Sequence, residues 1–205
     1  MPKTRARTRN RMQESYSQEP LRLFRCYPRV TGARQGKPGH WSFVPRPQFH
    51  GRWDNADLYD SWYFSRTAVG AVAESFYNKR RWIPEVFLTP AGEPRAILEL
   101  EYSGPELVDL DDARVLLDLG VRPSAVVVQD LGVTQALAKR VFEERSGDRG
   151  GISWWSSQMP AETSVLLWGE GGVPPAGLKV VGIQALSAEH PAVVEAAGRL
   201  YREVG

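Results

Sequence analysis

Three side chains that could do chemistry stand at equal spacing in residues 49–76, FHGRWDNADLYDSWYFSRTAVGAVAESF. They are Arg52, Tyr63 and Glu74, each eleven residues from the next. The Arg52 guanidinium can bind phosphate oxygens bidentately, and the Tyr63 ring can stack on a flat heterocycle. Glu74 adds a carboxylate beside the apolar stripe of a predicted helix. A hydrophobic core needs none of these groups, so the stretch is a candidate binding site.

Arg25 is a second arginine in an unusual position. It lies in the predicted strand LRLFRCYP, residues 21–28, on the same face as Leu21 and Leu23. An unpaired charge on a half-buried strand face costs free energy. Arg25 is therefore either paired with a carboxylate, Glu99 or Glu101, or free to bind an anion.

The other candidates have equally ordinary alternatives when each is taken alone. Arg52 has Asp54 as an obvious local partner, and Tyr63 is a suitable core residue. Glu74 beside an apolar stripe is more often a rim residue than a catalyst, and Ser156 in WWSS can be a turn residue. The functional interpretation depends on these residues acting as a set.

The first half of the chain supplies the elements that would position this set. We expect strands at 21–28 and 58–64, joined by a long loop at 29–50 that is rich in glycine, proline and arginine. Loops of about twenty residues in a compact domain are often functional. Ser65 is expected to cap a helix over 66–78 that carries Glu74 on its second turn.

In the second half, alternation predicts strands at 93–102, 125–128, 150–154, 164–168 and 178–183. Helices are expected after Asp111 or Asp112 as far as Gly120, from Thr134 to about Arg145, and from Pro191 to Glu203. The regular βαβ rhythm of a dinucleotide fold is missing. The sequence therefore predicts an α+β fold of mixed small β-sheets flanked by about four helices.

Charge divides the 205 residues into a basic arm and a mildly acidic body. The chain carries +2, and residues 1–12 alone contribute +5, so the other 193 residues carry −3. We divide the chain into a flexible basic arm at 1–20 and a catalytic domain at 21–205. A basic arm can neutralise nucleic-acid phosphates, but this one has no interleaved aromatic residues, which favours a solvated leader.

Composition also argues against a membrane protein, a secreted protein and a metal site. No segment has the apolar length of a membrane span or of a secretory signal, so we expect a cytoplasmic protein without a membrane partner. A single cysteine and three histidines without ligand spacing indicate no metal site. The common phosphate-binding glycine motifs are missing as well.

Taken in order, the candidates resemble the RES domain family, which is named for its arginine, glutamate and serine. The likeness runs from about residue 21 to 183. It is carried by Arg25 in LFRCY, by Gly51-Arg52-Trp53, by Tyr63 and Glu74, and by the GIxWxS stretch that ends at Ser156. The arginine-rich arm and the long loop at 29–50 depart from the family pattern. The resemblance implies an ADP-ribosyltransferase-like fold and a bacterial toxin that consumes NAD.

The resemblance also implies a role for each residue. NAD is the substrate, no metal or other cofactor takes part, and the nicotinamide–ribose bond breaks through an oxocarbenium-like transition state. Glu74 would hold the ribose and stabilise its positive charge. Arg25 and Arg52 would bind the pyrophosphate or the adenylate side, Tyr63 would stack on nicotinamide, and Ser156 would hydrogen-bond to the amide or the ribose. The expected catalytic residues are Glu74, Arg52, Tyr63 and Ser156. The NAD site would also include Trp53.

The implied partner is an antitoxin with a helix-turn-helix region and a C-terminal segment that blocks the site, and the complex could contain a toxin homodimer. We expect the loop at 29–50 and the turn 156–163 to form the mouth of the site. The acceptor of the ADP-ribosyl group stays open between water, phosphate and a protein side chain, so a protein-modifying ADP-ribosyltransferase is the nearest alternative.

Two further alternatives remain. A RES-like domain that has lost its activity could still bind its partner. A nucleic-acid-binding module would use the basic arm and four aromatic residues taken as exposed, namely Trp41, Trp53, Trp154 and Trp155. The charge of −3 on the body disfavours direct nucleic-acid binding.

Overall fold

A computed structural model describes residues 19–205 of the chain, so all but Glu19 and Pro20 of the predicted arm at 1–20 lies outside the described residues. The strands are β1 (Leu21–Tyr27), β2 (Asp60–Ser65), β3 (Arg81–Trp82), β4 (Ala96–Tyr102), β5 (Leu107–Asp109), β6 (Gly151–Trp155), β7 (Thr163–Gly169), β8 (Leu178–Ala185) and β9 (Glu203–Val204). The helices are α1 (Ala68–Phe76), α2 (Ala113–Asp118), α3 (Pro123–Val127), α4 (Leu131–Arg145) and α5 (Pro191–Arg199), with a 3₁₀ turn η1 at Pro84–Phe87.

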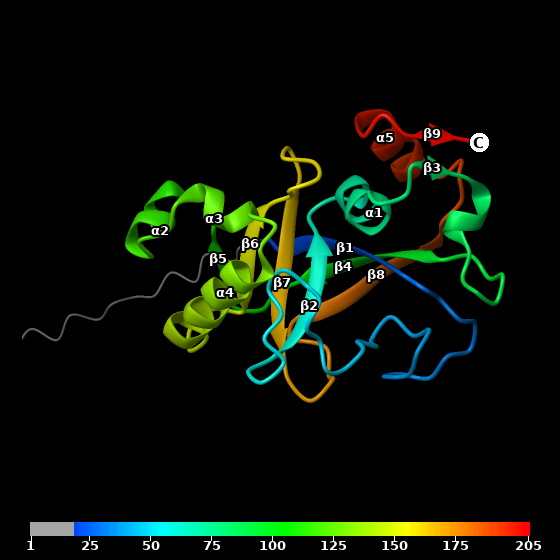
Figure 1. Cartoon of the computed structure of the whole chain (residues 1–205). Helices are drawn as coiled ribbons and strands as arrows, with labels where there is room; N and C mark the ends of the chain where they lie inside the picture. The colour runs from blue at the N-terminus through cyan, green and yellow to red at the C-terminus, as the bar shows by residue number, and fades with distance from the viewer. Residues whose placement is uncertain (1–18) are drawn as a thin grey trace, which may run out of the picture.

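A seven-stranded sheet in the order β5-β6-β7-β2-β1-β4-β8 forms the centre of the fold, and β3 and β9 make a small separate sheet. Every neighbouring pair in the large sheet is antiparallel except β5 and β6. β1 pairs with β2 through Phe24 and Ser65 alone, although it pairs with β4 along its whole length. The sheet therefore opens between β1 and β2, and Figure 1 shows these strands running in different directions.

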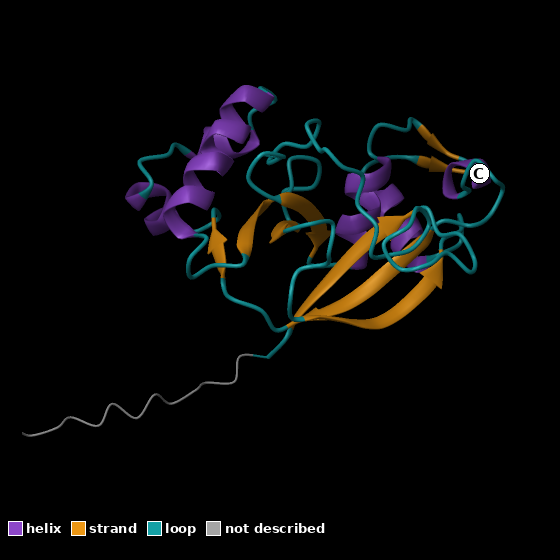
Figure 2. Cartoon of the chain, turned by 90° about the horizontal axis from the view of Figure 1, so that it is seen from below, coloured by secondary structure: helices purple, strands orange, loops and turns teal. Residues whose placement is uncertain are grey.

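Helices cover the sheet in two groups (Figures 1 and 2). α1 and α5 pack on each other and on the β4 side through a cluster that includes Phe76, Trp82 and Ile97. α2, α3 and α4 pack against β5, β6 and β7 through a second cluster that includes Leu116, Val126 and Ile152. The loop at 29–50 contributes Val44 to a third cluster with residues of β1, β2, β4 and β7. Two of the three clusters thus pack helices onto one half of the sheet each, and the third joins the two halves.

Helix α1 begins directly after β2 and carries the predicted catalytic glutamate. Thr67 is its N-cap, and the Thr67 hydroxyl accepts a hydrogen bond from the Gly70 N–H at 2.9 Å. The same hydroxyl donates to Glu162, which in turn pairs with Arg199 of α5 at 2.8 Å. This chain of contacts fixes the start of α1 and the direction in which its second turn points.

The α+β class is confirmed, but the strands form one large sheet and one small sheet instead of several small ones. The predicted strand at 125–128 is wrong, because Pro123 occupies the first turn of α3 and the valines that follow continue that helix. Ser65, the predicted cap of α1, is instead the last residue of β2. α5 ends at Arg199 and not at Glu203, which lies in β9.

Candidate active site

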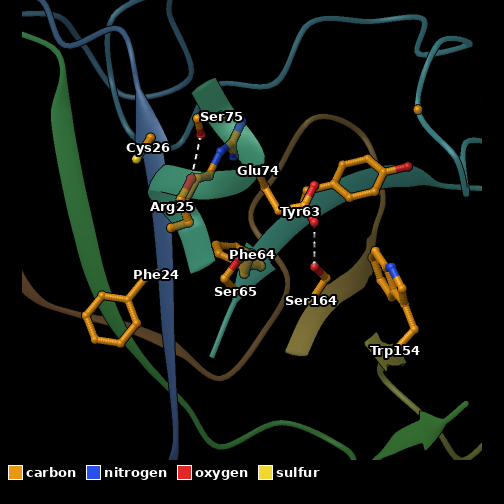
Figure 3. Close-up of a pocket in the computed structure, with 12 residues that line it drawn as sticks. Phe24, Arg25, Cys26, Tyr63, Phe64, Ser65, Glu74, Ser75, Trp154 and Ser164 are labelled. Carbon is orange, nitrogen blue, oxygen red and sulfur yellow. Dashed lines mark hydrogen bonds between the residues drawn. The ribbon is translucent and has the colours of Figure 1, made fainter. Parts of the chain in front are cut away.

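The candidate site is a cavity of about 290 Å³ at the point where β1 and β2 separate. Its wall combines residues of β1, β2, α1, β6 and β7 with Gly51 from the segment before β2 (Figure 3). The lining residues are Phe24, Arg25, Cys26, Gly51, Tyr63, Phe64, Ser65, Ala71, Glu74, Ser75, Trp154 and Ser164. Residues 25–27 of β1 have no partner in β2. The cavity therefore opens where β1 and β2 are no longer paired.

The Glu74 carboxylate is held in this cavity by two serines from the other half of the sheet. Its Oε1 accepts a hydrogen bond from the hydroxyl of Ser156. It also accepts one at 3.5 Å from the hydroxyl of Ser164 (Figure 3). The Ser156 oxygen itself accepts from the N–H groups of Gln158 at 3.1 Å and Met159 at 3.0 Å. Its proton is thus free to point to Glu74, whose Oε1 acts as the acceptor.

Tyr63 lines the cavity with its ring while its hydroxyl is committed to the protein. The hydroxyl donates to Asp54 Oδ1 at 2.8 Å and accepts from the Trp53 N–H at 3.0 Å. Burial and the neighbouring carboxylate of Asp54 raise the pKa of Tyr63 well above its usual value. Tyr63 is therefore neutral, and its ring stands edge-to-face with Trp154 at 6.4 Å between centroids.

Arg25 carries an unused guanidinium nitrogen at the cavity. Its Nη1 is buried and has no hydrogen-bond partner among the described residues. The carboxylates considered as partners are paired elsewhere, Glu99 with Arg22 at 2.6 Å and Glu101 with Lys179 at 3.3 Å. The guanidinium lies 5.6 Å from the centre of the Trp62 ring. Desolvation by burial lowers the pKa of Arg25 to about 10, so the side chain is still charged at neutral pH.

Arg52 is not paired with Asp54, which the sequence analysis gave as its alternative, purely structural partner. It donates to the backbone carbonyls of Val128 and Val126, the latter at 3.5 Å, and to the Ser157 hydroxyl at 3.4 Å. It forms no salt bridge with any residue in 19–205 and does not line the cavity. The guanidinium fixes the end of α3 to the turn after β6, beside Ser156.

Two sequence-based expectations about the site need correction. The Trp53 ring is fully buried in the second core cluster against Trp154, so in this conformation it contacts the framework of the site and not the cavity. Trp154 is itself only 5% exposed. Two of the four tryptophans taken as exposed for the nucleic-acid-binding alternative, Trp53 and Trp154, are therefore buried. In addition, none of the residues that line the cavity comes from the loop at 29–50 or the turn at 156–163.

Ser164, Asp54 and Gly51 are parts of the site that the sequence analysis did not assign. Asp54 accepts from the Gly51 N–H at 2.6 Å as well as from Tyr63. A Cβ on residue 51 would clash with both the Tyr63 hydroxyl and the Asp54 carboxylate. The sequence GRWD was the available signal, because its glycine and its aspartate together create the socket for the tyrosine.

No group of three or more potential metal ligands occurs among residues 19–205. None of the helices in this part of the chain is both long enough and apolar enough to cross a membrane.

Comparisons with known proteins give a family match and a similar fold. The RES domain model matches residues 22–188, and no curated protein matches the sequence. Among solved structures, the fold is similar to a chain of the M. tuberculosis MbcT–MbcA toxin–antitoxin complex. The TM-score is 0.57 with 11% identity, over 89% of this chain and 90% of that one. An identity this low supports the fold alone, whereas the family model spans most of the chain, from β1 to the segment between β8 and α5. The chain therefore belongs to the RES domain family.

Proposed function

We propose that this protein is the toxin of a toxin–antitoxin pair and that it cleaves the nicotinamide–ribose bond of NAD. The observation that carries the proposal is the position of Glu74. Its carboxylate faces a cavity, two serine hydroxyls orient it, and no cation neutralises it among residues 19–205. Such a carboxylate is suited to stabilising a positive charge that develops on a sugar ring.

In the proposed reaction the bond between ribose C1′ and the nicotinamide nitrogen breaks, and its electron pair leaves with the nicotinamide. The ring, positively charged in NAD, becomes neutral, while the ribose acquires oxocarbenium character. Glu74 opposes this charge. The oxygen of an acceptor, water or phosphate, then bonds to C1′ and releases a proton when the acceptor is water. NAD is the substrate, and the reaction as proposed uses no metal or further cofactor.

The remaining cavity residues bind the substrate in this proposal. Arg25 offers its unpartnered Nη1 to a phosphate oxygen, and a charge-assisted bond of this kind is stronger than a neutral one. Tyr63 and Trp154 offer aromatic surface to the nicotinamide. Ser156 acts through Glu74, and Arg52 through the turn that carries Ser156. A volume of about 290 Å³ lies near the lower end of small-ligand sites, so the adenosine end would extend beyond the rim.

The antitoxin partner is supported by family membership and by the fold likeness to a chain of a toxin–antitoxin complex. We propose that a C-terminal segment of an antitoxin with a helix-turn-helix region enters the cavity. A carboxylate of that segment would take the place of the substrate phosphate at Arg25. Such a segment competes directly with NAD, and an interface of ordinary size can hold the site closed.

Identification of the products tests the enzymatic part of the proposal. Purified protein is incubated with NAD, with and without phosphate, and the released nicotinamide and the ribosyl product are identified. We expect Glu74→Gln to lower turnover about 10²–10³-fold, the usual cost of one such electrostatic contact. Glu101→Gln is the matched control. That carboxylate pairs with Lys179 and does not line the cavity, so the variant should retain full turnover.

The outcomes separate the alternatives. Free ADP-ribose indicates water as the acceptor, a phosphorylated product indicates phosphate, and ADP-ribose attached to a protein indicates the ADP-ribosyltransferase. Unchanged NAD, or equal turnover in wild type and Glu74→Gln, contradicts the proposal. In bacteria, expression of the wild type alone should arrest growth and lower cellular NAD, and co-expression of the antitoxin should restore both.

A further inference from the structure

A second cavity of about 170 Å³ lies next to the candidate active site. Cys26 of β1 and Ser75 of α1 line both cavities and so form a shared wall, one residue away from Glu74. The far side of the second cavity is built from the turn after α1, from η1 and from the residue that precedes β4. We call it the cationic cavity, and its lining is Cys26, Ser75, Phe76, Asn78, Lys79, Val86 and Arg95.

The charges around the cationic cavity all have one sign. Lys79 and Arg95 both line it, and no aspartate or glutamate does. Neither cation forms a salt bridge with a carboxylate in residues 19–205. Arg95 donates from Nε to the Leu88 carbonyl at 3.2 Å, and no bond of its two terminal nitrogens is found in this part of the chain. Two cations that share a cavity without a counter-charge repel each other, which an anion would relieve.

The polar groups between the two cations are neutral. Burial raises the pKa of the Cys26 thiol to about 12, so the shared wall carries no thiolate. The Phe76 carbonyl at the end of α1 would oppose an anion, but it already accepts from the Lys79 N–H at 2.9 Å and from Trp82 Nε1 at 3.2 Å. Asn78 adds an amide that can donate two hydrogen bonds. The cationic cavity therefore presents donors and positive charge to whatever occupies it.

We propose that the cationic cavity is a phosphate-binding subsite of the active site, with Arg95 and Lys79 as its cationic ligands. The proposal rests on the proposed function, in which both NAD and one possible acceptor carry phosphate. Arginine suits the flat face of a phosphate group, and lysine binds it as a point charge. A water molecule occupies about 30 Å³ in the liquid, so about 170 Å³ has room for a group of five heavy atoms.

Two sources share this chemistry, inorganic phosphate and a phosphate of the dinucleotide. The first experiment titrates inorganic phosphate into the NAD-free protein by calorimetry. The second measures the affinity of NAD in a Glu74→Gln background, where substrate is not consumed. Each experiment compares its parent protein, wild type in the first and Glu74→Gln in the second, with the same protein carrying Lys79→Gln/Arg95→Gln. We call this double substitution the cavity variant. The control is Arg80→Gln/Arg114→Gln, which removes the same charge from exposed residues outside the cavity.

We expect the cavity variant to weaken one of the two affinities at least tenfold, and the control to stay within twofold. Loss of inorganic phosphate binding with NAD affinity retained identifies the free ion, and the converse identifies the dinucleotide. If both affinities match the parent in a folded variant, the proposal is wrong. If the double variant does not fold, Lys79→Gln alone decides by the same criteria, because Lys79 is exposed and its loss disturbs no packing.

These results are separable from the proposed function. A wild type that fails to cleave NAD, but whose phosphate binding disappears in the cavity variant, contradicts the proposed reaction and keeps the subsite. A wild type that cleaves NAD, with both affinities unchanged by the cavity variant, contradicts the subsite and keeps the reaction.

Discussion

Replacing Arg25 by methionine should stabilise the protein while removing its affinity for NAD. The guanidinium is desolvated, its Nη1 has no partner among residues 19–205, and its pKa is lowered to about 10. At 1.36 kcal/mol for each pKa unit, this corresponds to about 3 kcal/mol against the charged form in the folded state. The contact with Trp62 offsets about 0.5–2 kcal/mol of this cost. Methionine keeps a long apolar side chain without the charge.

We therefore expect the free energy of unfolding to rise by about 1–2 kcal/mol, measured by denaturant titration at pH 7. For a chain of this size the melting temperature should rise by about 2–8 °C. The sign can also be followed with pH. Below pH 10 the arginine is charged in both the folded and the unfolded state, so its cost is fully present. Above pH 10 the folded state releases the proton before the unfolded state does, and the advantage of the variant should shrink.

Arg22→Met is the matched control on the same strand. Its side chain is 64% exposed and pairs with Glu99 at the surface, so its loss should change stability by no more than about 1 kcal/mol and leave NAD affinity intact. A large loss of stability in Arg25→Met would show that Arg25 supports the fold and is not kept for a ligand. Unchanged NAD affinity in that variant would remove Arg25 from the proposed site.

Three further predictions concern neighbours of the cavity. Ser156→Ala should lower kcat in steady-state assays, because Glu74 loses its donor. It should also lower the free energy of unfolding by about 1–3 kcal/mol in denaturant titration, because two backbone N–H groups lose their acceptor. Ser164→Ala should lower kcat less, because its contact with Glu74 is longer. Arg52→Ala should raise the KM for NAD by releasing the turn beside Ser156, and Arg52→Lys should not restore it, because lysine lacks the planar fork. A normal KM in Arg52→Ala would refute this positioning role. Cys26→Ala should reduce the loss of stability from pH 9 to 12, since the buried thiol stays protonated in the folded state while the unfolded chain releases its proton above pH 9. Identical pH–stability profiles for wild type and variant would contradict it.

The local features of the site could be predicted because they depend on neighbours in the sequence. Alternation in 21–28 and helical spacing after residue 66 indicated the strand that carries Arg25 and the helix that carries Glu74. The order of arginine, tyrosine, glutamate and serine indicated the family, which the match to residues 22–188 confirms. These signals are short-range and do not require knowledge of which strands are neighbours.

Predictions from residue type were wrong where a single residue or a contact distant in the sequence decided the secondary structure or the burial. The valine-rich segment at 125–128 favours a strand, yet Pro123 starts a helix and packing of Val126 in the core retains it. Trp53 and Trp154 were taken as exposed aromatic residues, but they pack on each other between α4 and the sheet. Composition could not show this, because burial depends on the helices that fold over these rings.

Only the tertiary structure decided whether Arg25 pairs with a carboxylate and whether a cavity exists. β1 and β4 pair so that Phe24 stands opposite Glu99 and Arg25 opposite Leu98. Adjacent residues of a strand point to opposite faces, so this register gives Glu99 to Arg22 and leaves Arg25 without a carboxylate. The sequence determined that two arginines and two glutamates occupy these strands. The register decided which pairs could form, and the separation of β1 from β2 beyond Phe24 and Ser65 left the space that Glu74 and Arg25 share.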